Sequence, residues 1–283
     1  MIRTLPLLVA LLGLGSALPA HAADGLEILD AGQGKKKLLA YTPTAGATQT
    51  FTTRMHTTIT IDMMGQKMPV PMPPIDYTFD WTIDEVQANG DFTFHLVCTD
   101  AQVRGGEGPT VDAMREPLRK IVGMKGQGVS DKHGKLRDYA IALDNASPEL
   151  QQSVNHVRDT VQRMQARLPD QPVGRGARWV VHDTVQGQGM SFAQDATYTL
   201  VEHKGSSITL DIELVQHADA QPMTPPGLPP GAEAHLESLE GSGKGRSSFD
   251  LGNLMPTAVT MTTDTDMAMT MTMGGATEGQ APP

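Results

Sequence analysis

The sequence is rich in methionine, a residue with a soft thioether side chain, with 17 in 283 residues. Two groups stand out: Met63, Met64, Met68 and Met72 early in the chain, and Met267, Met269, Met271 and Met273 at alternate positions near its end. Thioethers are soft ligands that select Cu(I), whereas flexible methionine surfaces also accept varied apolar guests. Alternate residues of a strand lie about 7 Å apart, so the second group alone does not converge on one ion. We therefore favour a methionine wall around a lipid-like ligand over copper binding.

Other chemically suggestive patterns depart from the motifs that they resemble. Residues 241–248 contain Gly-Lys but lack the spacing of a phosphate-binding loop. Residues 189–193 lack the final glycine of a hydrolase elbow. The carboxylates of one acidic region fall on polar strand faces or at turns: Asp62, Asp80, Asp84 and Glu85. The sequence thus predicts no catalytic, cofactor-binding or metal-ligating residue, and we expect a protein that is not an enzyme. A hydrolase with an unrecognised site is the remoter alternative.

Histidine and cysteine give no metal or redox signature. The histidines beyond the N-terminal segment are His56, His95, His133, His156, His182, His203, His217 and His235. None forms a His-x-His or His-x-x-x-His pair, so their spacing does not support a metal site. The single cysteine, Cys98, ends an apolar alternating run and is predicted to be a buried strand thiol that acts as a small hydrophobe.

The N-terminus has the three parts of a secretory signal peptide. Arg3 is followed by an apolar run over 5–14 and by the small-residue pattern Ala20-His21-Ala22. We predict a signal peptide over 1–22, cleaved after Ala22, and a periplasmic or secreted protein with no transmembrane segment after cleavage. Residues 23–35 are expected to be a linker. The net charge of −10 argues against nucleic acid as a partner.

Most of the remaining chain alternates apolar and polar residues with a period of two, as strands with one buried face do. The clearest segments are 55–63, 77–86, 92–103, 179–185, 198–201, 208–215 and 259–273. Asn89-Gly90 between two of these segments is a strong hairpin signal. One apolar face per strand indicates antiparallel sheets that pack on one side only.

Two segments have helical spacing, and one pattern recurs in both halves of the chain. Residues 111–122 contain Pro117, which is expected to shorten or kink the helix. Residues 147–168 begin with a capping Ser147 and end before Pro169. A Gly-x-Gly strand follows a pair of strands at 126–128 and again at 243–245. We predict a mainly β (α+β) fold with two related, curved, half-barrel-like antiparallel sheet units, 36–143 with a short helix and 174–273, joined by the helix 147–168 and followed by a disordered tail, 274–283.

Residues 168–179 read L-P-D-Q-P-V-G-R-G-A-R-W. With Met114, Gly126, Gly128 and Tyr198, they resemble a family of uncharacterised exported bacterial β-rich proteins, a domain of unknown function with the signature L-P-x-x-P-V-x-x-G-x-x-W. This resemblance implies export and a β-rich fold, and no activity. The fold expected is also similar, more loosely, to periplasmic half-barrel carriers of lipids and lipoproteins, although fold alone does not give function.

Taken together, these patterns favour an exported, non-enzymatic binding protein for an apolar or amphipathic, lipid-like ligand. One-sided strands with methionine-rich faces carry this expectation. The alternative is a structural or interaction module that binds another envelope protein.

Overall fold

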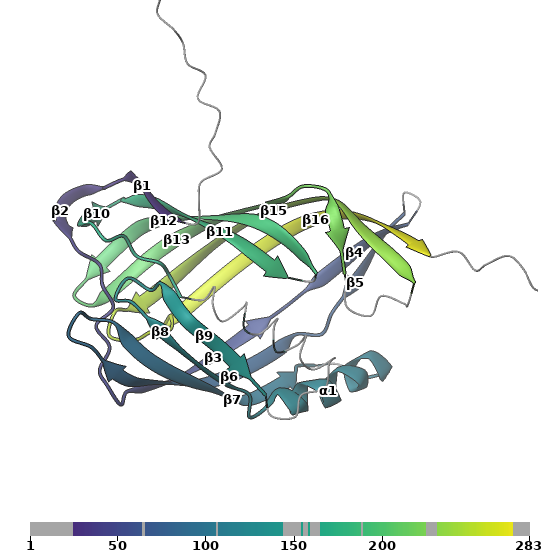
Figure 1. The fold of residues 1–283 in the computed structure, drawn as a ribbon, viewed down its shortest axis with the longest axis horizontal. Coiled ribbons are helices and arrows are strands. Elements are labelled where there is room, and N and C mark those ends of the chain that lie inside the picture. Colours follow the sequence, from purple (N-terminus) through teal and green to yellow (C-terminus); the bar gives the residue numbers. More distant parts are fainter. Residues whose placement is uncertain are drawn as a thin grey trace, which may run out of the picture.

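The computed structural model describes residues 25–63, 66–105, 107–143, 154, 158, 165–187, 189–224 and 231–273. Strands dominate these residues and form two antiparallel sheets that face each other, the larger of them curled like half a barrel (Figure 1). The expectation of a mainly β fold with a half-barrel-like sheet is confirmed. The predicted signal peptide, 1–22, and the predicted tail, 274–283, lie outside the described residues.

The larger sheet has seven strands. They are β1 (Gly25–Asp30), β11 (Arg178–Gly187), β12 (Met190–Lys204), β13 (Ser207–Ala218), β14 (Gln221–Met223), β15 (Ala232–Asp250) and β16 (Ala258–Met273). Strands β13 and β14 pair with one side of β15, and β16 pairs with its other side. The linker predicted over 23–35 is wrong, because β1 pairs with β11 and residues 33–37 form β2. The short, partly charged segments lack the long alternation by which strands were recognised.

The smaller sheet has five strands in the order β3-β6-β7-β8-β9. They are β3 (Thr48–Met55), β6 (Ile75–Val86), β7 (Phe92–Val103), β8 (Lys125–Ser130) and β9 (Leu136–Ala142). Strands β4 (Thr58–Met63) and β5 (Gln66–Pro71), which lie between β3 and β6 in the chain, form a separate hairpin. Strand β2 (Gln33–Lys37) pairs with β10 (Val173–Arg175).

One helix, α1 (Pro109–Ile121), is seen along its full length in the described chain. It begins with Pro109 in its first turn and continues through Pro117 to Ile121, so Pro117 does not shorten the helix. Most of the helix predicted over 147–168 lies outside the described residues. Val154 and Arg158 are helical, but residues 165–168 are not. No helix among the described residues is long and apolar enough to cross a membrane.

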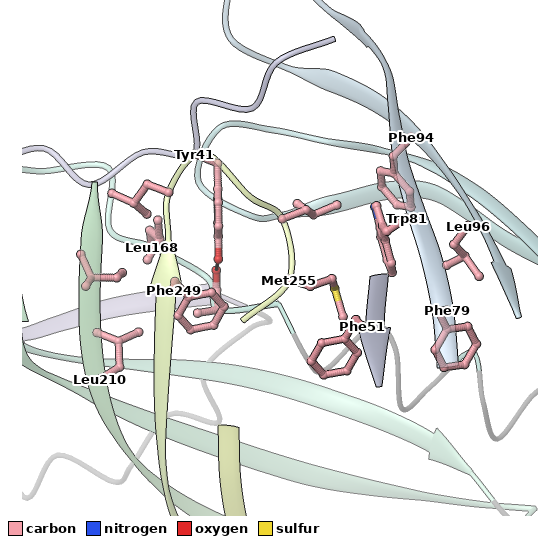
Figure 2. Packing of buried hydrophobic residues seen from close by; sticks show 14 of the residues in the cluster. Tyr41, Phe51, Phe79, Trp81, Phe94, Leu96, Leu168, Leu210, Phe249 and Met255 are labelled. Carbon is pink, nitrogen blue, oxygen red and sulfur yellow. Dashed lines mark hydrogen bonds between the residues drawn. The ribbon is translucent and has the colours of Figure 1, made fainter. Parts of the chain in front are cut away.

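The two sheets pack through the inner faces of their alternating strands. Residues of both sheets form one buried cluster. Tyr41, in the segment before β3, meets Phe249 of the larger sheet edge to face, with ring centroids 6.4 Å apart, and within the smaller sheet Trp81 packs on Phe94 at 4.7 Å. Figure 2 shows Met255 between these groups, close to residues of both sheets. All five side chains are at least nine-tenths buried. Burial of large apolar groups is the main stabilising contribution that holds one sheet on the other.

Connecting segments fasten the two sheets at one end, which we call the closed end. The Gln49 side chain of β3 donates to the carbonyl oxygen of Met255 and accepts from its backbone N–H, both at 3.2 Å. The Tyr41 hydroxyl donates to the Ala166 carbonyl oxygen at 3.1 Å, and the Trp179 indole donates to that of Arg167 at 2.9 Å. Three residues of the 168–179 signature are therefore structural anchors, since Leu168, Val173 and Trp179 are all buried.

Candidate functional site

The inner face of the larger sheet changes in character along its strands. At the closed end it belongs to the large core. One step further, direct cross-strand pairing aligns a set of polar residues that we call the polar row: Asp183 on β11, Gln194 on β12, Gln216 on β13 and Thr265 on β16, with Gly241 of β15 between the last two. Beyond this row the inner face becomes apolar again. The polar row thus separates two apolar regions of one concave surface.

The side chains of the polar row contact each other. The Gln216 amide donates to the Gln194 Oε1 at 2.9 Å, and the Arg167 guanidinium donates to Asp183 at 3.1 Å. Gly241 makes this arrangement possible, because a Cβ atom there would lie only 2.6 Å from the Gln216 Oε1 and 3.3 Å from the Thr265 Oγ1. Two uncharged polar side chains therefore converge over a glycine of the neighbouring strand.

A second, smaller apolar cluster lies beyond the polar row, towards the open end of the sheet. Its buried members are Met190, Ala218, Met223, Ala234, Leu236 and Leu239, with Phe192 packed against them. These residues come from β12, β13, β14 and β15. The cluster is separate from the large core and does not involve the smaller sheet.

Three methionines of β16 extend this cluster into solvent, and we call them the methionine stripe. Met267, Met269 and Met271 lie directly opposite Leu239, Leu236 and Ala234 of β15. Directly opposed residues of antiparallel strands share one face of the sheet. The methionines are 40%, 42% and 64% exposed. A continuous apolar surface therefore runs from a buried cluster to exposed thioether side chains.

Strand β16 itself is exposed on both faces. Every residue from 257 to 272 is exposed, and in the described chain only β15 pairs with β16. Its alternation predicted one packed face, and the packing partner is missing within the described residues. Of the earlier methionines, Met68 is exposed on the separate β4–β5 hairpin and Met64 lies outside the described residues.

Three histidines of the sheet surfaces are paired with carboxylates. His95 bonds Asp84 at 2.6 Å, His182 bonds Asp195 at 2.7 Å and His217 bonds Glu240 at 2.6 Å. The hydrogen bond to Glu240 and, to a smaller extent, the one to Asp219 raise the pKa of His217 above its usual value. The described residues contain no group of three or more His, Cys, Asp or Glu side chains placed to hold a metal. The geometry is that of cross-strand surface pairs.

The remaining sequence motifs take structural positions. The glycine-rich segment 241–248 is the middle of the long strand β15. Ser191 accepts a hydrogen bond from the Gln186 side chain, and its backbone N–H donates to Gln221. Cys98 is fully buried in β7, and burial raises the pKa of its thiol to about 11. The prediction of a buried strand thiol is confirmed.

A hollow of about 500 Å³ lies between β7 and α1. Its lining combines Asp100 and Gln102 with Arg115 and Arg119 of the helix. Gln102 donates to Asp100, and Arg115 donates to Asp112. This charged cleft is less suited to an apolar guest than the concave face of the larger sheet.

The sequence interpretation found the methionines but missed the polar row. A signal for the row was present, because Gln194 and Gln216 replace apolar residues at inner positions of otherwise alternating strands. No protein-family model matches the chain, and neither a curated protein nor a solved structure is significantly similar to it.

Proposed function

We propose that this protein is an exported, non-enzymatic binding protein that holds an apolar or amphipathic, lipid-like ligand on the open part of its concave sheet. The observation that carries the proposal is the methionine stripe, which continues a buried apolar cluster into solvent. Exposed apolar surface of this kind marks a site where another molecule covers it.

The chemistry of the stripe fits a flexible hydrocarbon guest. Methionine is unbranched and polarizable, so Met267, Met269 and Met271 adapt to chains of different length and shape. Burial contributes about 0.8 kcal/mol for each methylene of the ligand, before the costs of association. An acyl chain laid along β16 beside Leu236 and Leu239 would lose contact with water on one side.

The origin of the protein forms part of the same proposal. A signal peptide over 1–22 sends the chain to the periplasm or outside the cell, and the signature at 168–179 relates it to the exported β-rich family described above. Half-barrel carriers of lipids and lipoproteins offer a parallel in fold.

We also propose that the two sheets are related units joined by a helical segment that includes Val154 and Arg158. The order β3-β6-β7-β8-β9 corresponds to β11-β12-β13-β15-β16, and in each series the fourth strand carries Gly-x-Gly. In both strands side chains of neighbouring strands cover the glycines, with Phe94 and Tyr139 over Gly128 and Met261 over Gly245. The correspondence of strand order and of glycine environment supports duplication.

Native mass spectrometry of gently purified protein, with metal analysis, tests the binding function. Extra mass that matches a lipid supports it. One copper per chain contradicts it. So does protein that carries no extra mass after exposure to a lipid extract.

A pair of variants localises the site. Met269→Glu places a charge in the methionine stripe, whereas Ala268→Glu places the same charge on the opposite face of the same strand. We expect Met269→Glu to weaken uptake of N-phenylnaphthylamine, an uncharged apolar fluorophore, by about tenfold or more, and Ala268→Glu to leave it nearly unchanged. Equal effects of the two variants would place the ligand elsewhere.

The exposed edge of β16 favours one second candidate, an interaction module of the envelope. A long strand with an unpaired edge is a template for strand addition by another protein. Affinity capture from an envelope extract, combined with sedimentation, separates the two functions. Ligand-free protein that recovers one specific envelope partner supports the module, and a strict monomer that recovers none argues against it.

A further inference from the structure

We infer that the polar row recognises an uncharged polar group of the ligand, such as the ester or amide linkage of an acyl chain, and discriminates against a free carboxylate or phosphate. This inference rests on the proposed function and adds the chemical class of the ligand's polar end. The structural basis is the amide pair Gln194 and Gln216, which borders the apolar cluster and the methionine stripe on the same concave face.

The amide pair has unused hydrogen-bonding capacity. Each glutamine amide carries two N–H donors and an oxygen that accepts twice. One N–H of Gln216 bonds the Gln194 Oε1, and no other described residue donates to the Gln216 Oε1 or accepts from the Gln194 amide. Gln194 is only 6% exposed. An ester carbonyl can accept from the free N–H of Gln194, and an amide can in addition donate to the Gln216 Oε1.

The position of the row suits the junction of an amphipathic molecule. Gln216 and Thr265 converge over Gly241, next to the pair Leu239 and Met267 on the same two strands. A chain that lies along the methionine stripe would therefore bring its first polar atoms to the two amides. Replacement of Gly241 by a larger residue would displace this arrangement, since its Cβ would contact the Gln216 side chain.

The charges nearby disfavour an acidic headgroup. The inner-face residues from the polar row to the stripe include no lysine or arginine in the described chain, and the Arg167 guanidinium at the far end of the row is paired with Asp183. An anionic group seated on the amides would therefore be desolvated without a counter-ion on the inner face, which is unfavourable.

Three probes with the same hydrocarbon tail test the inference: monododecanoylglycerol, dodecanoate and dodecylammonium. Their affinities are measured by displacement of N-phenylnaphthylamine at about pH 8, where the carboxylate is ionised. We expect monododecanoylglycerol to bind at least about tenfold more tightly than dodecanoate. Gln216→Leu should reduce this preference about fivefold, the effect of one hydrogen bond, while binding of the tail persists. Gln186→Leu, which removes an amide on the opposite face of the sheet, is the matched control.

Each outcome has a distinct meaning. Neutral selectivity that Gln216→Leu lowers and Gln186→Leu preserves supports the inference. Equal or tighter binding of dodecanoate or dodecylammonium overturns it but leaves the binding function intact. Failure of all three probes and of the fluorophore overturns the binding function as well.

Discussion

At the scale of single residues, Asp76 of β6 is the most strongly engaged carboxylate of the described chain. It is almost fully buried and accepts three hydrogen bonds, two from Arg54 and one from Arg104, at 2.7–2.8 Å. The bonds from Arg54, together with the one from Arg104, lower the pKa of Asp76 to about 2, against the opposing effect of burial. The triad joins β3, β6 and the end of β7 on the outer face of the smaller sheet.

The Asp76 triad gives a prediction for acid stability. Because its folded-state pKa lies below the ordinary value of 3.8, the stabilisation is complete above about pH 4 and is lost as the pH falls through 2. We expect Asp76→Asn to lower the free energy of unfolding at neutral pH by about 1–3 kcal/mol and to flatten its dependence on pH between about 4 and 2. Denaturant titrations at several pH values measure both effects.

Asp80→Asn is the matched control for Asp76. It lies on the same face of β6 but accepts from one neutral hydroxyl, that of Thr50. A similar loss in both variants, or an unchanged acid slope in Asp76→Asn, would show that the arginine pair does not stabilise this end of the sheet.

The two tryptophans form a natural comparison of a satisfied and an unsatisfied indole. Trp179 donates to the Arg167 carbonyl oxygen, whereas no described residue accepts from the equally buried indole of Trp81. Substitution by phenylalanine removes similar volume from both sites. We expect Trp179→Phe to cost about 1–2 kcal/mol more than Trp81→Phe, because it leaves a buried carbonyl oxygen without its donor. Equal costs in urea titrations would contradict this account.

At the scale of elements, the sequence predicted strands better than it predicted what lies beside them. Alternation correctly marked 259–273 as a strand, but a period of two fixes only which residues share a face. It does not specify whether another element covers that face, and in β16 none of the described residues does. The glycines of 241–245 weaken the strand signal of that segment, because glycine is a poor strand former. The side chains of Gln216 and Met261, on neighbouring strands, pack over these glycines and supply the contacts that glycine lacks. The local sequence does not reveal such contacts.

The exposed edge of β16 leads to a prediction about solubility. Asp264 and Asp266 are its only charged residues, and charges on an edge strand oppose pairing with further chains. The double variant Asp264→Thr, Asp266→Thr should self-associate at protein concentrations where the unchanged protein does not. Light scattering and sedimentation measure this change. The control, Glu107→Thr with Asp170→Thr, removes the same charge from exposed loop positions and should stay dispersed.

Association of both double variants alike would point to net charge and not to the edge. In that case β16 would need no protection by its two aspartates, and the interaction module would lose its structural basis.

At the scale of the whole molecule, the candidate site depends on how elements distant in sequence align. Methionine content alone indicated adaptable apolar surface, which the exposed stripe of β16 agrees with. The polar row required the registers of four strand pairs, from Asp183 to Thr265, and registers are set by core packing and turns that a single sequence does not reveal. The sequence therefore predicted the chemical class of one part of the site but not its polar boundary.

The shared core predicts that the two sheets unfold together, even if they arose as related units. Their inner faces build one hydrophobic cluster, and Gln49 and Met255 bond them at the closed end. Neither sheet keeps its main buried surface alone, so one cooperative transition is expected. Trp179→Phe leaves Trp81 as the only tryptophan, which reports on the smaller sheet, and Trp81→Phe leaves Trp179, which reports on the larger. Within each variant, the fluorescence and circular dichroism curves should coincide in denaturant. A tryptophan signal that changes before the circular dichroism in either variant would mean that one sheet opens first, and that the proposed ancestral unit still folds without its partner.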